Sequence, residues 1–362
     1  MKEVLLLIPN LKGGGAERVV VDLVNNFKSK KYNLTLMTLY DVGINKELLN
    51  DHVRYKFFRK HQIRGIWRIY KLIPAKILHR IIIRDKYDIE IAYLEGIVTK
   101  IISGGNNKVK KIAWLHCELT NHEKYFLKIY GSATKFRCVY SKFNKIACVS
   151  KDVRKSFSDK LLLGFENLAI VHNVIDQDRI LGLADEINSF TPNDSVINFV
   201  SVGRLVEQKG YKRLLSVFRM LKDYPIHLHI LGDGPDYEYL CNYIKDNNLR
   251  NVTLLGFIKN PYSYMKKMDC YICSSFQEGY STAVAEALIL HLPVISSKCS
   301  GSEELCSLGR GIVCENSESG IHDGILEYLN DNLKIKEAAS NNKMLKEDAL
   351  KSFHDLLDDV MK

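Results

Sequence analysis

The stretch Ser274-Ser-Phe-Gln-Glu-Gly-Tyr-Ser-Thr-Ala-Val-Ala-Glu-Ala287 follows an apolar run at residues 269–273 and leads into another at 282–290. The first run is typical of a short buried β-strand, and the second has the composition of a helix. If the helix begins near Ser281, Glu278 lies in the loop before it and Glu286 lies about one turn inside. The stretch therefore predicts a strand-to-helix turn with two carboxylates beside a helix N-terminus.

Such a helix N-terminus is a ready site for phosphate, because its free N–H groups and the positive end of the helix dipole favour an anion. Gly279 lets the backbone approach a ligand, since it carries no Cβ. One carboxylate near a neutral polar group, a second one deeper and an anion site between them suit a nucleotide diphosphate that carries a sugar. Taken alone, the pattern also fits an ordinary turn and a solvated Glu286.

The length of 362 residues predicts two domains rather than one core. A hydrophobic content of 46% is normal for a globular protein. No apolar run reaches the roughly 18 residues that a membrane span needs. The apolar run that follows Glu3 is short and has no small-residue cleavage site, so it predicts a first strand rather than a signal peptide.

The nine cysteines are odd in number and scattered, which argues against a disulfide framework and favours a reducing cytoplasm. Cys270 and Cys273 form a CxxC pair, but the pair lies in an apolar strand and has no partner pair at zinc spacing. We therefore expect buried structural cysteines rather than a metal or redox site.

The chain begins with an apolar run at residues 3–9, a glycine-rich turn with Gly13, Gly14 and Gly15, and apolar residues at helical spacing. Strand, glycine loop and helix in this order predict the start of a doubly wound α/β domain. The pattern is not GxGxxG, so it does not meet the dinucleotide fingerprint. A later apolar run at 111–115 ends at His116, where a parallel sheet presents functional groups. A hydrogen-bonded structural histidine is the alternative.

A polar segment at residues 185–195 containing Pro192 predicts a domain linker, and the strand–loop–helix alternation restarts after it. The sequence therefore predicts an α/β protein with two doubly wound, Rossmann-like domains that face each other across a cleft. The predicted domains span residues 1–187 and 188–345, with residues 346–362 forming a C-terminal helix that could cross back to the first domain.

Arg204 and Lys209 lie in the first strand-to-helix loop of the predicted second domain. The carboxyl ends of parallel strands share one edge of a sheet, so this loop and the stretch around Glu278 should reach the same place. A guanidinium can fork to two phosphate oxygens and a lysine supplies a point charge, which suits a diphosphate. Exposed surface charges are the alternative.

Positive charge is concentrated in the first half of the chain, where residues 1–190 hold 33 Lys+Arg and 19 Asp+Glu. Residues 54–86 hold 11 basic residues and one acid, with apolar residues interleaved, and we interpret this segment as helical with a break at Pro74. Basic amphipathic segments suit an anionic membrane surface, here through Arg59, Arg64, Trp67, Arg68 and Lys71. A solvated helix with its apolar stripe on the core is the alternative. No motif for nucleic acid accompanies the charge.

Several motifs occur in a familiar order along nearly the whole chain: Gly14-Gly-Ala-Glu-Arg18, His116, Val171-His-Asn-Val-Ile-Asp176, Val202-Gly-Arg-Leu, Gln208-Lys-Gly210, Leu231-Gly-Asp-Gly-Pro235, Glu278-Gly-Tyr-Ser-Thr-Ala-Val-Ala-Glu286 and Pro293-Val-Ile295. In this set the chain resembles bacterial retaining glycosyltransferases of family 4, which have the GT-B fold and build surface polysaccharides or lipid-linked glycans. The two-glutamate motif together with Gly-Arg…Lys-Gly is specific, whereas the glycine loop alone is not.

The resemblance implies a role for each matching residue. Arg204 and Lys209 would hold the donor diphosphate, Glu286 the ribose hydroxyls, and Glu278 with Gly279 and Tyr280 the donor sugar. Ser281 and Thr282 would offer amides to the phosphates, Phe257 and Ile258 would border the base, Gly14 and Gly15 would admit donor phosphate and acceptor, and His116 would lie near the reacting side of the sugar.

Two positions depart from the family pattern, because His291 stands where glycine is common and Cys299-Ser-Gly-Ser-Glu-Glu304 replaces a glycine-rich turn. No Asp-x-Asp motif lies in the expected setting, so we expect no catalytic metal and no cofactor beyond the nucleotide-sugar substrate. No residue is an evident covalent nucleophile, which favours front-face departure with retention of configuration.

The expected function is transfer from a nucleotide-sugar, with UDP-sugars favoured by the resemblance, to a lipid-linked or oligosaccharide acceptor. The expected location is cytoplasmic, peripheral on the inner face of the plasma membrane. A nucleotide-sugar epimerase of the same fold is one alternative. A non-enzymatic basic membrane-binding protein with a nucleotide pocket is the other.

Overall fold

The structure is a computed structural model that describes the chain except residues 64, 120–125, 128, 162–166, 308–310 and 340–344. The described residues form two compact units. The first comprises Met1–Ile175 and Leu345–Lys362, and the second comprises Asp176–Met344.

The first unit is built on a parallel sheet that has seven strands in the described residues, in the order β3-β2-β1-β4-β5-β6-β7. The strands are β1 (Lys2–Ile8), β2 (Tyr32–Tyr40), β3 (Arg54–Arg59), β4 (Ile89–Ala92), β5 (Lys110–Leu115), β6 (Lys145–Cys148) and β7 (Leu168–Ile170). Its helices are α1 (Gly15–Asn26), the 3-10 turn η1 (Ile44–Leu48), α2 (Ile66–Leu72), α3 (Ala75–Ile82), α4 (Ile97–Ser103), α6 (Ala133–Tyr140), α7 (Lys151–Leu161) and α15 (Leu345–Met361).

The second unit repeats the plan with six parallel strands in its described residues, in the order β10-β9-β8-β11-β12-β13. The strands are β8 (Ile197–Val202), β9 (Ile226–Leu231), β10 (Val252–Gly256), β11 (Cys270–Cys273), β12 (Val294–Ser297) and β13 (Gly311–Cys314). The helices are α8 (Gln177–Ala184), η3 (Glu207–Lys209), α9 (Tyr211–Met220), α10 (Tyr237–Asp246), α11 (Tyr262–Met265), α12 (Thr282–Ile289), α13 (Ser302–Cys306) and α14 (Glu318–Ala339).

The central strands are buried on both faces, as continuous apolar runs predict for parallel sheets. All residues from Val4 to Ile8 of β1 have no exposed surface. In the second unit, Phe199 of β8 packs in the core with Phe218 of α9 and Tyr328 of α14. The two doubly wound sheets confirm the fold class that the sequence predicts.

The division between the units differs from the predicted boundary after residue 187. Residues 176–187 belong to the second unit, because α8 packs on α11 and α12 and the Asn260 side chain donates to the Leu183 carbonyl over 2.8 Å. The polar segment 185–195 is not a free linker either. The Lys267 ammonium donates to the carbonyls of Asn188 and Phe190, and the Phe190 ring lies 5.1 Å from that of Tyr264.

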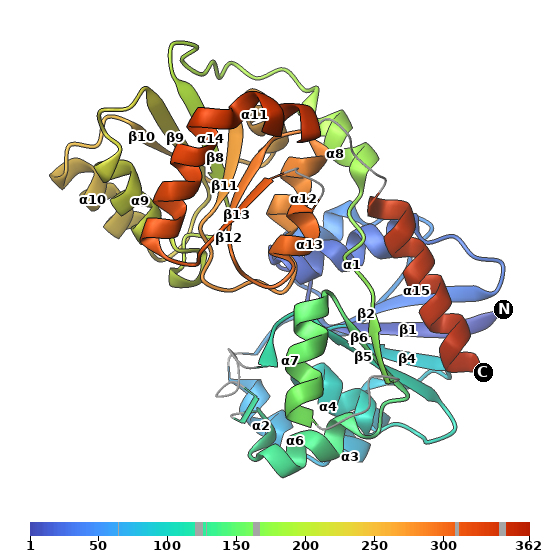
Figure 1. Ribbon diagram of the computed structural model, residues 1–362. Coiled ribbons are helices and arrows are strands. Elements are labelled where there is room, and N and C mark those ends of the chain that lie inside the picture. The colour runs from blue at the N-terminus through green and yellow to red at the C-terminus, as the bar shows by residue number, and fades with distance from the viewer. Residues whose placement is uncertain (64, 120–125, 128, 162–166, 308–310, 340–344) are drawn as a thin grey trace. The chain divides into compact units, whose positions relative to one another are not determined.

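The last helix, α15, belongs to the first unit although it comes from the far end of the chain, as its red ribbon beside the blue strands shows (Figure 1). The ring of Phe353 lies 5.1 Å from that of Phe27, at the end of α1. The Tyr32 hydroxyl donates to Asp358 over 2.6 Å, and Lys31 pairs with the same carboxylate over 2.9 Å. The first unit is therefore completed by the C-terminal helix.

The basic segment at 54–86 is only partly helical, which corrects the sequence interpretation. Arg54–Arg59 is an edge strand, β3, paired in parallel with β2, and the helices among the described residues of the segment are α2 and α3 on either side of Pro74. Alternating residues of β3 can pack on the sheet while Arg54 and Lys56 stay exposed, and basic side chains are common on edge strands. Arg59 therefore sits on a strand, not on a helix.

Candidate functional site

Arg204, Lys209 and Glu278, candidate site residues of the second unit, lie in loops that follow the two strands where the strand order reverses. β8 and β11 are neighbours in the sheet. The chain continues from β8 to β9 on one side of this pair and from β11 to β12 on the other side. The loop after β8 carries Arg204 and Lys209, and the loop after β11 carries Glu278. In open α/β sheets the carboxyl edge at such a switch point is the usual place for a ligand.

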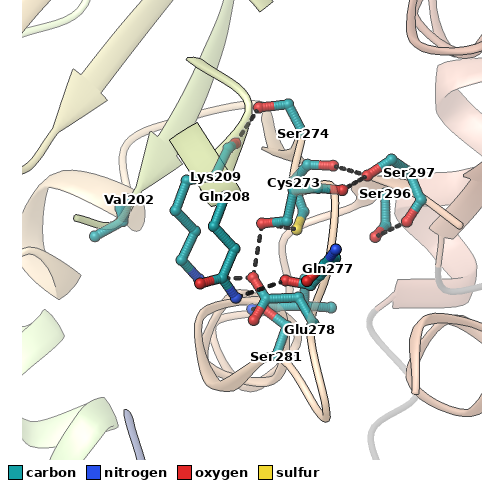
Figure 2. A network of polar contacts seen from close by, with 12 residues as sticks. Val202, Gln208, Lys209, Cys273, Ser274, Gln277, Glu278, Ser281, Ser296 and Ser297 are labelled. Atoms are coloured by element: carbon teal, nitrogen blue, oxygen red, sulfur yellow. Dashed lines mark hydrogen bonds and ion pairs between the residues drawn. The ribbon is translucent and has the colours of Figure 1, made fainter. Parts of the chain in front are cut away.

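Lys209 and Glu278 form an ion pair, with the lysine Nζ 2.6 Å from the glutamate Oε1 (Figure 2). The pair is largely shielded, since 26% of the lysine side chain and 11% of the glutamate side chain are exposed. The Ser275 hydroxyl donates to the same Oε1 over 2.6 Å. Two donors thus hold one oxygen of Glu278 in a fixed orientation.

The charge of Lys209 is secure at neutral pH. Burial by itself lowers the pKa of Lys209, but the nearby charge of Glu278 and their hydrogen bond outweigh it, and the pKa stands above its usual range. An ammonium has three N–H donors and Glu278 takes one, so the group can also bind a ligand anion. The Arg204 side chain is exposed and forms no ion pair within the described part of the chain.

The helix after Glu278 begins where the sequence predicts. Ser281 is the N-cap of α12, and its side chain accepts a hydrogen bond from the Val284 amide. Thr282 is the first helical residue, while Gly279 and Tyr280 are buried immediately before it. The N-terminus of α12 therefore follows the Lys209–Glu278 pair by a few residues.

Glu286 lies on α12 and accepts a hydrogen bond from the Tyr262 hydroxyl over 3.0 Å. Tyr262 comes from α11, which no motif singled out. Phe257 and Ile258 follow β10, and the Phe257 side chain is 66% exposed whereas Ile258 is half-buried. The structure thus places a carboxylate inside the helix and an exposed aromatic ring on a neighbouring loop of the same unit.

Hydrogen bonds join the turn 207–210 to the loop 274–278 along their length. The Ser274 hydroxyl donates to the Lys209 carbonyl over 2.9 Å, and the Gln208 side-chain amide donates to the Gln277 carbonyl over 2.9 Å (Figure 2). The Phe276 amide donates to the Gln208 carbonyl over 2.8 Å. Sequence reasoning quoted Gln208 and Ser275 within motifs but gave no role to them or to Tyr262, because nothing in their spacing indicates a hydrogen-bond partner remote in the chain.

His116, Gly14 and Gly15 belong to the first unit. Gly14 is the N-cap of α1 and Gly15 its first residue. His116 follows β5, and its Nε2 lies 3.1 Å from the Tyr93 carbonyl, which can only accept, so we assign the proton to Nε2. Burial lowers the pKa of His116 to about 4, despite the opposing effect of the Tyr93 carbonyl. The imidazole is therefore neutral at pH 7, with its lone pair on Nδ1.

Glu95 supports the loop that carries His116, and sequence reasoning missed it. The buried Glu95 carboxylate accepts hydrogen bonds from the backbone amides of His116 and Cys117. Burial raises the pKa of Glu95, although these amides oppose the shift. Its place after β4, next to the switch between β1 and β4, becomes evident only from the strand order.

Four of the five proposed membrane-docking residues are described, with Arg59 on β3 and the other three on α2. Arg59, Arg68 and Lys71 are exposed, Trp67 lies in α2, and Arg64 falls outside the described residues. No helix among the described residues combines the length and apolar character that crossing a bilayer requires.

Cys270 and Cys273 are free and buried, as expected. Among the described residues, no group of three or more His, Cys, Asp or Glu side chains is arranged to hold a metal ion.

The second unit thus carries cations, two carboxylates and a helix N-terminus on the strand-to-helix side of its sheet, near the switch point between β8 and β11. The fold is the GT-B fold: HepE of Anabaena, solved in complex with UDP and glucose, superposes with a TM-score of 0.76 at 19% identity over 100% of both chains. Residues 184–346 match the family model described as Glycosyl transferases group 1.

Two relatives extend this similarity beyond the second unit. An uncharacterised glycosyltransferase of Methanocaldococcus jannaschii is 33% identical over 248 residues, which is 64% of this chain and 59% of that protein. The N-acetylgalactosamine-N,N'-diacetylbacillosaminyl-diphospho-undecaprenol 4-alpha-N-acetylgalactosaminyltransferase of Campylobacter jejuni is 27% identical over 352 residues, covering 94% of this chain and 93% of that one. The family-model match over residues 184–346, the relatives and the fold together show a glycosyltransferase of GT-B fold.

Proposed function

We propose that the chain transfers a sugar, with retention of configuration, from a nucleoside diphosphate sugar to a lipid-linked or growing cell-surface glycan. The observation that carries the proposal is the Lys209–Glu278 ion pair at the switch point between β8 and β11. It sets a cation for a diphosphate and a carboxylate for sugar hydroxyls side by side. A UDP-sugar is the proposed donor, which the UDP held by HepE supports.

In this proposal each donor group has a defined contact. Arg204, Lys209 and the amides at the start of α12 would bind the diphosphate, and Glu278 would accept hydrogen bonds from the sugar. Glu286 would bind the ribose hydroxyls, with its carboxylate oriented by Tyr262. Phe257 and Ile258 would border the base. Gly14, Gly15 and His116 would serve the acceptor and the reacting side of the sugar.

Catalysis in this scheme is mainly positioning and charge stabilisation. As the glycosidic bond to the diphosphate breaks, negative charge grows on the leaving oxygen and would be met by Arg204, Lys209 and the helix N-terminus, without a metal ion. A diphosphate oxygen would take the proton of the acceptor hydroxyl, which attacks from the same face. A covalent glycosyl adduct trapped on Glu278 would refute the front-face route.

The acceptor is proposed from the surface of the first unit and from the relatives. The C. jejuni relative is named for a diphospho-undecaprenol-linked acceptor. On α2 and α3, Ile69, Leu72, Ile77 and Ile81 expose between 46% and 84% of their surface beside basic residues. Other apolar residues of these helices, such as Tyr70, Leu78 and Ile82, face the core. Apolar side chains among cations suit an anionic bilayer surface, so we propose peripheral attachment to the inner face of the plasma membrane.

The test of the donor is nucleotide release from a panel of UDP-, GDP- and ADP-sugars in EDTA, with and without a lipid extract of the source cells. Release from one donor that rises with the extract would support a metal-independent transferase and identify the sugar. Release that requires an added divalent cation would refute metal independence. Epimerised sugar without acceptor would overturn the transferase proposal, as would absence of donor binding by folded protein.

Liposome binding tests the membrane surface separately. We expect Arg59, Arg68 and Lys71 changed together to Gln to lose most binding to anionic vesicles, since each basic residue near the surface contributes about 1 kcal/mol. The matched control changes three exposed lysines of the second unit, Lys222, Lys245 and Lys259, to Gln. Equal losses in both variants, or binding that does not weaken with salt, would contradict a specific docking surface.

A further inference from the structure

Arg213 is a buried cation that lies outside the motifs singled out in the sequence. It stands in the first turn of α9, and only 5% of its surface is exposed. In the described part of the chain it forms no ion pair with a carboxylate. A buried charge without partners would be strongly destabilising, so its location requires specific hydrogen-bond acceptors.

The acceptors are backbone carbonyls of the loop that carries Glu278. The Arg213 Nε and Nη2 donate to the Ser274 carbonyl over 3.0 and 2.7 Å, and Nη2 donates to the Ser275 carbonyl over 2.9 Å. The guanidinium carbon also lies 3.9 Å from the centre of the Phe276 ring. Arg213 therefore contacts three consecutive residues between β11 and Glu278.

The same loop is held from the side of Lys209. Gly210 separates Lys209 from α9 and has a φ of +68°, and a Cβ there would lie 2.0 Å from the Ser274 carbonyl oxygen. Only glycine allows this approach. The turn with Lys209, the start of α9 with Arg213 and the loop with Glu278 thus form one packed block.

We infer that Arg213 is a positioning residue for the donor, one that fixes the loop 274–278 against the turn 207–210 so that Glu278 and Lys209 meet the sugar and its diphosphate in one geometry. The inference rests on the proposed function for the roles of Glu278 and Lys209. Arg213 touches no reacting group, so it acts only through the loop. Its loss should therefore remove the contribution of Glu278 rather than add an independent loss.

A double-mutant cycle tests this coupling, with Arg213→Lys and Glu278→Gln alone and together, measured as kcat and KM for the best donor. Lysine keeps the charge but cannot fork to two carbonyls. We expect each single variant to lower kcat/KM by about 10- to 100-fold. The kcat/KM of the double variant should lie within about threefold of that of the less active single variant. Additive losses would overturn the inference, because a merely structural defect does not depend on Glu278.

Binding measurements give a second readout. Arg213→Lys should weaken the nucleotide-sugar more than the nucleoside diphosphate alone, since Glu278 is proposed to contact only the sugar. Arg219→Lys is the matched control, because Arg219 lies exposed on the same helix and bonds to Asn247. Equal weakening of both ligands by Arg213→Lys would overturn the inference.

Hydrogen exchange distinguishes failure of the inference from failure of the proposed function. Amides of residues 274–278 should exchange faster in Arg213→Lys than in wild type without any ligand, at a melting temperature within a few degrees. If Arg213→Lys does not fold, Phe276→Leu serves in its place, since it removes the stacked ring but no buried charge. Unchanged exchange in Arg213→Lys would overturn the inference that Arg213 fixes the loop 274–278. Faster exchange in Arg213→Lys than in wild type, together with a wild-type chain that binds no nucleotide-sugar, would uphold the inference about Arg213 and refute the proposed function.

Discussion

At the scale of single residues, Lys209 and Glu278 show how a polar site is built before its ligand arrives. Each neutralises the other, so neither charge is left uncompensated in a partly buried place. Ser275 and Lys209 both bond to the same oxygen of Glu278 in the network of Figure 2. A donor sugar can therefore be met by an oriented carboxylate.

Removing either proposed phosphate cation should slow the reaction. We expect Arg204→Ala and Lys209→Ala each to lose about 2–4 kcal/mol of transition-state stabilisation, by analogy with removing an oxyanion donor. The measurement is kcat/KM for the identified donor. Lys212→Ala is the control, since Lys212 pairs with Asp236 instead. Turnover close to wild type in both variants would remove the diphosphate assignment.

His116 should make the first unit sensitive to acid. Its pKa is about 4 in the folded chain and about 6.5 when unfolded, so the unfolded state binds more protons between these values. The stability is complete above pH 6.5 and is lost as the pH falls towards 4. We expect His116→Gln to remove about 2–4 kcal/mol of this pH dependence.

Urea unfolding at pH 7.5 and pH 4.5 measures this difference. The exposed His61 provides the control variant, His61→Gln, which should keep the pH dependence of the wild type. An identical loss of stability on acidification in wild type and His116→Gln would show that the folded histidine is not held neutral.

At the scale of elements, the N-terminus of α12 lies close to Glu278 in the chain, because its N-cap residue follows Glu278 by three positions. We expect Ser281→Ala to cost about 1 kcal/mol of unfolding free energy and also to weaken nucleotide binding. Ser132→Ala, at the N-cap of α6 in the first unit, is the matched control. It should cost similar stability with nucleotide affinity unchanged. Equal affinity in both variants would separate the α12 N-terminus from the ligand.

Elements also show where sequence patterns fail. The apolar runs of β1 and α12 correctly predicted a strand and a helix. Each run is buried within its own unit, and its apolar pattern matches one type of secondary structure. The composition of the basic segment at 54–86 did not predict its structure. Arg54–Arg59 has enough charge to suggest a solvent-exposed segment, yet it pairs with β2 as an edge strand. Edge strands need burial on one face only, so their composition is ambiguous.

At the scale of the whole molecule, the last helix completes the first unit. Phe353 is fully buried against Phe27 and Trp114. We expect Phe353→Ala to cost about 3–5 kcal/mol of unfolding free energy, because it leaves a cavity. Lys351→Ala, an exposed change on the same helix, should cost little. Hydrogen exchange resolves the units, and the loss should appear in the first one. Destabilisation confined to the second unit would contradict this packing.

The sequence by itself determined the doubly wound fold, the strand-to-helix loops and the residue types proposed to bind a nucleotide-sugar, because buried parallel strands and glycine-rich turns have local signatures. It also placed Ser281 at the start of α12 and Glu286 inside that helix. Only the tertiary structure decided that β8 and β11 are neighbours, which brings Lys209 against Glu278 across 69 positions of chain. The same holds for Arg213, Tyr262 and Glu95. Their partners are remote backbone or side-chain atoms, and strand order and packing, which no local pattern encodes, bring them together.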